Sequence, residues 1–234
     1  MPNSNIRQWN DDPLDFVWRL NNKLHSLWVS HFYPFASIGH HVSFHRTSKI
    51  YRPRAPRIRL GNYISLREYA WLSVATEDPN GEPTIVIDDN CHIGFGSIIS
   101  ARNRIHLERD VLVGQMVLMV DHNHAYEDIS IPVIDQGVTE GGTIRIGSGT
   151  WVGHGACVIC PRGELTIGRN CVIAANSMVM RSIPDYSVVA GYPATIIRQY
   201  DPEKKAWRAG GKRVRSQRDT ESQGNLNTVA VSSD

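Results

Sequence analysis

The chain has 234 residues, of which 41% are hydrophobic and 21% are charged, and its formal net charge is +2. This length favours one domain with appendages, and so mild a charge gives no reason to expect a nucleic-acid-binding protein. No apolar stretch approaches the roughly 20 residues that span a bilayer, and the N-terminal MPNSNIRQWNDDP lacks the apolar core of a signal peptide. We therefore expect a soluble protein of the cytoplasm.

The N-terminal segment, residues 1–57, contains one predicted helix. Asp12 and Pro13 are typical of a helix start, and apolar residues then recur at helical spacing to about Ser30. Two interpretations remain open: the helix packs against the open end of the fold that follows, or it lies on a membrane surface. The next segment, YRPRAPRIR (residues 51–59), is either a solvated loop or a binding site for phosphate groups.

From residue 58 to residue 200 the sequence repeats with a period of six, which fits neither a helix nor one long strand. It fits coils of three short strands, each strand contributing one side chain to a triangular core. The five sets are Leu60, Leu66 and Leu72; Ile87, Ile93 and Ile99; Leu107, Val113 and Met119; Ile146, Val152 and Val158; and Ile167, Ile173 and Val179. Smaller side chains also point inward at Cys91, Ser97, Val117, Ala156, Cys171 and Ser177.

The four cysteines fit this pattern. Cys91 and Cys171 occupy inward positions, and Cys157 and Cys160 form a lone C-x-x-C without the second pair that a zinc site needs. We expect all four to be structural and reduced.

The repeat resembles the hexapeptide-repeat acyltransferases over roughly residues 58–200. The resemblance is most specific in IGSGTWVGHGACV and in SVVAGYPATIIR, which is similar to the branch of maltose, galactoside and nodulation-factor O-acetyltransferases and many surface-polysaccharide acetyltransferases. It implies an all-β fold, a left-handed parallel β-helix, with acetyl-coenzyme A as co-substrate. It also implies a homotrimer with active sites between neighbouring β-helices.

The six-residue rhythm stops at DHNHAYEDISIPVIDQGVTEGG, residues 121–142, so we predict a loop that leaves the coil there. The relatives carry a catalytic histidine in a loop at this point, and His122 matches it by position. Neutral imidazole can take a proton from a hydroxyl or amine near neutral pH. His124 is a candidate for contacting the acceptor. Three carboxylates are able to orient His122: Asp121, Glu127 and Asp128.

The resemblance further implies a coenzyme A site on the later coils. The matching positions are Trp151, His154, Ala175, Met180, Arg181 and Arg198. Trp151 and His154 match residues along the pantetheine arm, and Ala175 matches an alanine whose backbone contacts the coenzyme. Met180 and Arg181 stand where relatives have Thr-Lys, and Arg198 matches an arginine that meets the nucleotide phosphates.

Two positions depart from the family pattern. Thr195 replaces a second basic residue, which weakens the expected phosphate contacts. Gly96 stands where maltose and galactoside enzymes have an acceptor-binding asparagine. The acceptor is therefore expected to differ from a simple maltose-like or galactoside-like sugar.

Two classes of function remain. The first is an acyl-coenzyme A-dependent transferase acting on a sugar hydroxyl or amine in surface-polysaccharide assembly; the second is a non-catalytic scaffold. The acceptor would be a sugar, a nucleotide sugar or a lipid-linked saccharide. Since the coenzyme residues lie on late coils, we expect the early arginines Arg52, Arg54 and Arg57 to bind phosphates of the acceptor.

Two further expectations concern metal and the C-terminus. β-Helical carbonic anhydrases share this architecture, but they need a third histidine besides a pair such as His40 and His45, so we expect no metal. Residues 201–234 are basic and then rich in polar side chains, and we expect a disordered tail.

Overall fold

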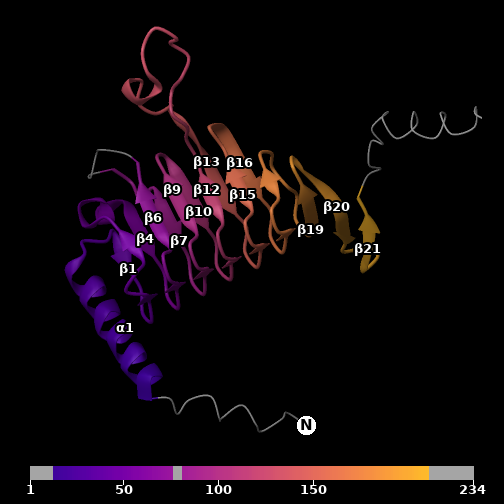
Figure 1. Cartoon of the computed structure of the whole chain (residues 1–234). Coiled ribbons are helices and arrows are strands. Elements are labelled where there is room, and N and C mark those ends of the chain that lie inside the picture. The colour runs from indigo at the N-terminus through magenta and orange to yellow at the C-terminus, as the bar shows by residue number, and fades with distance from the viewer. Residues whose placement is uncertain (1–12, 76–80, 211–234) are drawn as a thin grey trace, which may run out of the picture.

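The computed structural model describes residues 13–75 and 81–210. One helix, α1 (Pro13–Phe32), lies at the N-terminal end of a stack of triangular coils (Figure 1). It extends two residues past its predicted end at Ser30. The predicted cap Asp12 and residues 211–234 of the predicted tail lie outside the described residues. Within the described part of the chain, no helix is long and apolar enough to cross a membrane.

Each coil contributes one strand to each of three faces. Face A contains β1 (Ser37–Ile38), β4 (Ile58–Leu60), β7 (Ile85–Ile87), β10 (Arg104–Leu107), β13 (Gly141–Ile146) and β16 (Arg162–Ile167). Face B contains β2 (Ser43–Phe44), β5 (Ser65–Leu66), β8 (His92–Ile93), β11 (Leu112–Val113), β14 (Trp151–Val152), β17 (Val172–Ile173), β19 (Ser187–Gly191), β20 (Ala194–Asp201) and β21 (Ala206–Ala209). Face C contains β3 (Lys49–Ile50), β6 (Trp71–Val74), β9 (Ile98–Ala101), β12 (Leu118–Val120), β15 (Cys157–Ile159) and β18 (Met178–Val179).

Strands on each face pair in parallel from coil to coil, except that β20 and β21 pair antiparallel at the end of face B. The 3₁₀ helices η2 (Arg52–Arg57) and η3 (Val133–Asp135) lie in connections between faces C and A. This all-β arrangement of three parallel sheets is that of a parallel β-helix. The predicted fold class is confirmed at this level.

The period-six side chains fill the interior. Every member of the five predicted sets is at most 2% exposed. Equivalent residues pair in register, as Leu60 with Ile87 and Ile87 with Leu107. Burying an aliphatic side chain of this size contributes about 1.5–3 kcal/mol. The predicted inward polar residue Ser97 is also buried, because its Oγ donates to the carbonyl of Gly114 (2.8 Å) and accepts from the N–H of Val117 (3.1 Å).

The β-helix begins earlier than the sequence pattern predicts, and antiparallel strands continue the ordered structure beyond its predicted end. A first coil, β1 to β3, precedes the predicted start at Ile58, with Ile38, Phe44 and Ile50 in the six-residue positions. The sequence reading missed it because the central residue is aromatic. The arginine segment η2 therefore follows one coil and does not precede the stack. At the other end, β20 and β21 give ordered structure to the start of the predicted tail.

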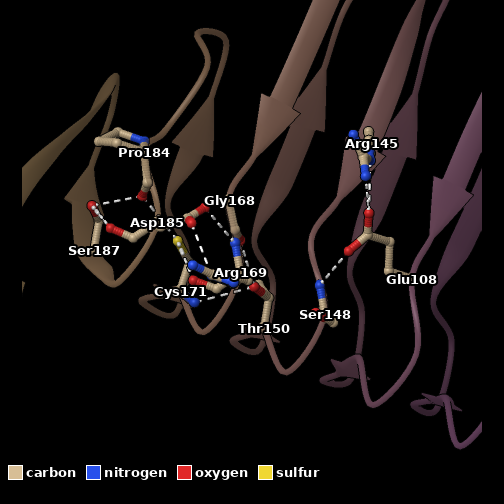
Figure 2. A network of polar contacts seen from close by, with 10 residues as sticks. All are labelled: Glu108, Arg145, Ser148, Thr150, Gly168, Arg169, Cys171, Pro184, Asp185 and Ser187. Atoms are coloured by element: carbon tan, nitrogen blue, oxygen red, sulfur yellow. Dashed lines mark hydrogen bonds and ion pairs between the residues drawn. The ribbon is translucent and has the colours of Figure 1, made fainter. Parts of the chain in front are cut away.

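Polar side chains fix the corners where face A turns into face B (Figure 2). Glu108 accepts from the guanidinium of Arg145 and from the N–H of Ser148 (2.9 Å). Partial burial disfavours the charged carboxyl, but the Ser148 N–H and Arg145 outweigh it and lower the pKa of Glu108. Further along, Asp185 accepts from the backbone N–H (3.0 Å) and the Nε (2.9 Å) of Arg169. These contacts tie successive coils together along one edge.

All four cysteines are free thiols, as predicted. Cys91 and Cys171 are buried in the core, and burial raises the pKa of Cys91 to about 12. The thiolate is the reactive form of cysteine, so Cys91 is a packing residue and not a nucleophile near neutral pH.

Candidate active site

The predicted loop leaves the β-helix between β12 and β13, at the edge where face C turns into face A, and projects well away from the coils (Figure 1). We call this the C–A edge. The base of the loop is a short antiparallel stem. The N–H of Gly142 donates to the carbonyl of Asp121 (2.6 Å), and the N–H of Thr139 donates to the carbonyl of Asn123 (2.8 Å). His122 lies between these two bonds, so its backbone is held although it stands outside the core.

Asp121 is completely buried at the foot of this stem. Its Oδ1 accepts from the N–H of Arg102 (2.7 Å), and its Oδ2 accepts from the N–H groups of Asn103 and Arg104 (2.9 Å each). These donors lie in the turn between β9 and β10 and at the first residue of β10, one coil earlier on the same edge. These N–H groups compensate the negative charge of the buried carboxylate and hold it in a fixed position.

The imidazole of His122 binds this carboxylate. Its Nδ1 lies 2.9 Å from Asp121 Oδ1. Because an ionised carboxylate only accepts, the hydrogen of the neutral ring is on Nδ1, and Nε2 carries the lone pair. Of the three carboxylates left open by the sequence, Asp121 is the one that orients His122. Asp128 is instead engaged by Ser130, whose hydroxyl and N–H lower the pKa of Asp128, and Glu127 is exposed.

Beside the stem lies a groove of about 620 Å³ between the loop and β16. Asn123, Tyr126 and Thr139 line its loop side, and Arg162 lies on its other side. His124 is exposed, and its backbone pairs with that of Val138 in an isolated antiparallel β-bridge. Sequence reasoning did not single out Arg162 or the residue 102–104 turn. The register of the repeat could have indicated both, because it places the corners of successive coils next to one another.

The predicted coenzyme residues lie on other parts of the β-helix. Trp151 is half exposed on face B. His154 and Ala175 are exposed in neighbouring corners between faces B and C, where the N–H of Asn176 donates to the carbonyl of His154 (2.8 Å). Trp151 and His122 therefore do not share a face within one chain.

The remaining predicted coenzyme residues lie apart from Trp151 and from one another. Met180 and Arg181 are exposed on the C–A edge, two coils beyond His122. Arg198 is exposed on β20 with its guanidinium 5.4 Å from the ring centre of Trp207.

The arginine segment η2 lies on the C–A edge, three coils before His122. At the ~4.8 Å spacing of neighbouring strands, three coils correspond to roughly 14 Å along the axis. Arg52 Nε donates to the carbonyl of Phe32 at the C-terminus of α1 (3.0 Å). Arg54 and Arg57 are half buried. Arg52 thus has a structural contact that the sequence did not reveal.

Comparison with known proteins identifies the class. No family model matches the chain. The chain is 34% identical over 136 residues to WbbJ of Escherichia coli, which carries the name of a lipopolysaccharide biosynthesis O-acetyltransferase; the match covers 56% of this chain and 68% of WbbJ. It is 28% identical over 161 residues to a probable acetyltransferase of Mycobacterium tuberculosis, covering 69% of this chain but only 49% of that protein. The chain belongs to the acetyltransferase family that includes WbbJ.

The fold is shared with a solved enzyme structure. The N-acyltransferase AntD of Bacillus cereus, in complex with dTDP and 3-hydroxybutyryl-CoA, matches 89% of this chain and 97% of its own with a TM-score of 0.58 and 17% sequence identity. This likeness shows the shared fold, and the match to WbbJ confirms the predicted resemblance to acetyltransferases.

Proposed function

We propose that this acetyltransferase transfers an acetyl group from acetyl-coenzyme A to a hydroxyl or amine of a sugar, in the cytoplasm, for surface-polysaccharide biosynthesis. The observation that carries the proposal is the buried Asp121 bound to His122 Nδ1 at the base of the loop. The name of WbbJ supports a saccharide acceptor, and the AntD complex supports a coenzyme A donor with a nucleotide-linked acceptor. In line with the family resemblance, we expect the coils to wind left-handed.

The chemistry follows from the free Nε2 of His122. This atom takes the proton from the acceptor hydroxyl or amine as the acceptor attacks the thioester carbonyl. The carbon–sulfur bond of the thioester then breaks, and the protonated imidazole returns the proton to the leaving coenzyme A thiolate. Asp121 stabilises the imidazolium that forms between these steps, as a carboxylate does for a catalytic histidine generally.

Coenzyme binding separates this function from the alternative of a non-catalytic scaffold. Acetyl-coenzyme A at about 100 times its Kd should stabilise the native state by about 2.7 kcal/mol. For a protein of this size we expect Tm to rise by roughly 5–10 °C. Thermal unfolding with and without acetyl-coenzyme A measures this rise, and Trp151→Ala should reduce it. A Tm that does not move with acetyl-coenzyme A would support the scaffold.

The separation of the candidate residues favours a site completed by a second chain. His122 lies on the C–A edge and Trp151 on face B, so one chain does not bring base and coenzyme channel together. The loop tip also presents apolar side chains to solvent, with Ile129 100% and Ile134 85% exposed. We propose a homotrimer in which the loop of one protomer reaches the coenzyme site of its neighbour.

The trimer is testable by sedimentation. We expect three chains per particle, and Ile129→Asp with Ile134→Asp should shift the protein toward smaller species, because buried apolar contacts would be replaced by charges. Turnover should fall with the loss of trimer. A monomer that retains full turnover would contradict the proposal.

The arginines of η2 are proposed to hold a phosphorylated acceptor, since they lie on the same edge as His122 and away from Arg198. Charged hydrogen bonds contribute about 1.5–3 kcal/mol each. Replacing Arg52 and Arg54 by alanine should raise the KM of a nucleotide-sugar acceptor by about tenfold or more. The KM of acetyl-coenzyme A should hardly change. Arg59→Ala, which removes a neighbouring exposed cation on β4, is the matched control. A rise in the coenzyme KM alone would assign these arginines to the donor.

A further inference from the structure

Helix α1 is attached to the β-helix by its small and polar side. Ser26 is buried against β2, where its Oγ accepts from the N–H of Phe44 (2.9 Å) and donates to the carbonyl of Asn22 (2.7 Å). Asn22 Oδ1 accepts from the N–H of Arg46 (3.3 Å). Val29 is the buried apolar residue of this side. The helix therefore packs against the backbone of the first coil through Asn22, Ser26 and Val29. The large apolar residues of the helix take no part in this contact.

The large apolar residues of the helix lie mostly exposed on the side opposite Ser26. They recur three or four positions apart and so lie on one side of the helix. We call them the apolar stripe: Val17, Leu20, Leu24, Leu27 and Trp28. They are 46–60% exposed. A surface helix of a globular protein normally buries such a side against the core, so this stripe is oriented for an outside partner.

The charge around the stripe indicates the chemistry of that partner. Residues 16–67 contain nine Lys and Arg and no Asp or Glu, although the whole chain carries a net charge of only +2. Lys23 lies beside the stripe and lines a groove of about 650 Å³ between α1 and the first coil, together with His40 and His41. On the other side the guanidinium of Arg46 lies 5.8 Å from the ring centre of Trp18. Arg52 joins η2 to the C-terminus of the helix.

We propose that the N-terminal end of the protein docks onto an anionic lipid bilayer. The apolar stripe inserts at the level of the headgroups, and Lys23 and Arg46 contact lipid phosphates. An interfacial helix has this combination of Trp and Leu on one side and basic residues at its flanks.

A second copy of the chain fits the stripe less well. A symmetric contact between two stripes would bring two strongly basic ends together, with no acidic side chain in residues 16–67 to compensate. Anionic headgroups complement both the apolar and the cationic part of the surface. The docking is independent of the acyl-transfer reaction and can be measured without any substrate.

The test is co-sedimentation of the full chain with vesicles of phosphatidylcholine alone and of phosphatidylcholine with an equal amount of phosphatidylglycerol. We expect at least about tenfold stronger partitioning onto the anionic vesicles, and a marked loss of binding at high salt. Leu20→Ser, Leu24→Ser and Leu27→Ser combined should reduce partitioning by about tenfold or more. Lys23→Gln with Arg46→Gln should reduce it severalfold.

The matched control is Tyr192→Ser with Ile197→Ser, which removes exposed apolar residues at the opposite end of the β-helix and should leave vesicle binding unchanged. Circular dichroism and Tm establish that each variant is folded, and the stripe residues are exposed enough to be replaced without loss of core packing. Absence of wild-type binding to anionic vesicles, or equal binding by the triple variant, would overturn the proposal. It is also overturned if the triple variant sediments as a smaller particle without lipid and binds vesicles like wild type, because the stripe then belongs to a contact between chains.

Discussion

His122→Ala should slow acyl transfer by about 10²–10⁴-fold, the usual contribution of general acid–base catalysis. The reason is local, because Nε2 is the ring atom left free by the bond between Nδ1 and Asp121. Coenzyme A affinity should remain nearly unchanged, because the proposed coenzyme residues lie on other parts of the β-helix. Single-turnover release of coenzyme thiol measures the rate, and the Tm rise with acetyl-coenzyme A measures binding.

His124→Ala is the matched control for this variant. His124 stands two residues away in the same stem and is exposed, so its removal should leave the fold of the stem intact. We expect it to affect the acceptor KM more than the rate of transfer. If His122→Ala retains more than about a tenth of the wild-type rate, the general base is another residue, and His124 is the next candidate.

Asp121→Asn should reduce both stability and catalysis. One oxygen of the carboxylate accepts two backbone N–H groups, and the other accepts one N–H and His122 Nδ1. An amide NH₂ must then face a donor on one of the two sides, and an unsatisfied buried donor costs about 1–3 kcal/mol. We expect Tm to fall by roughly 2–4 °C per kcal/mol.

The catalytic loss in Asp121→Asn should be about 10²-fold or more in kcat, because the amide group no longer holds His122 with its hydrogen on Nδ1. Ser97→Ala separates this effect from lost stability. It removes another buried polar side chain that bonds two backbone groups but lies away from His122. Measured well below both Tm values, Ser97→Ala should keep wild-type kcat. Equal losses of kcat in the two variants would show that Asp121 has only a structural role.

The period of six was sufficient to predict most of the fold, because only one aliphatic side chain per short strand fits a triangular interior. Leu60, Ile93 and Ile167 therefore lie where the pattern put them. The first coil was missed at Phe44, where an aromatic residue fills the aliphatic position and α1 helps to cover the coil. The helix itself was predictable, but its orientation was not. Helical spacing places the large apolar residues on one side, and it does not say whether that side faces the protein.

The candidate site, too, was predictable from the sequence only in part. The interrupted rhythm predicted the loop, and the resemblance to relatives with a catalytic histidine at this point implied His122. The choice of Asp121 over Glu127 and Asp128 depends on three N–H donors from the previous coil, which no local pattern contains. The contact of Arg52 with Phe32 was hidden for the same reason, because it joins residues that are 20 positions apart.

The unequal spacing of the coils has a consequence for how such enzymes diversify. Paired residues on face A are 20 or 21 positions apart between Ile85 and Ile105 and between Ile144 and Leu165, but 39 apart between Ile105 and Ile144. Within a coil the step from Leu107 to Val113 to Met119 stays at six, so the whole excess enters at the C–A edge. Insertions at the edge between faces A and B would break the polar contacts that Glu108 and Asp185 make there, whereas the C–A edge accepts additional residues at little cost in stability. We therefore expect the C–A edge to be the position at which a different acceptor specificity can be added to an unchanged scaffold.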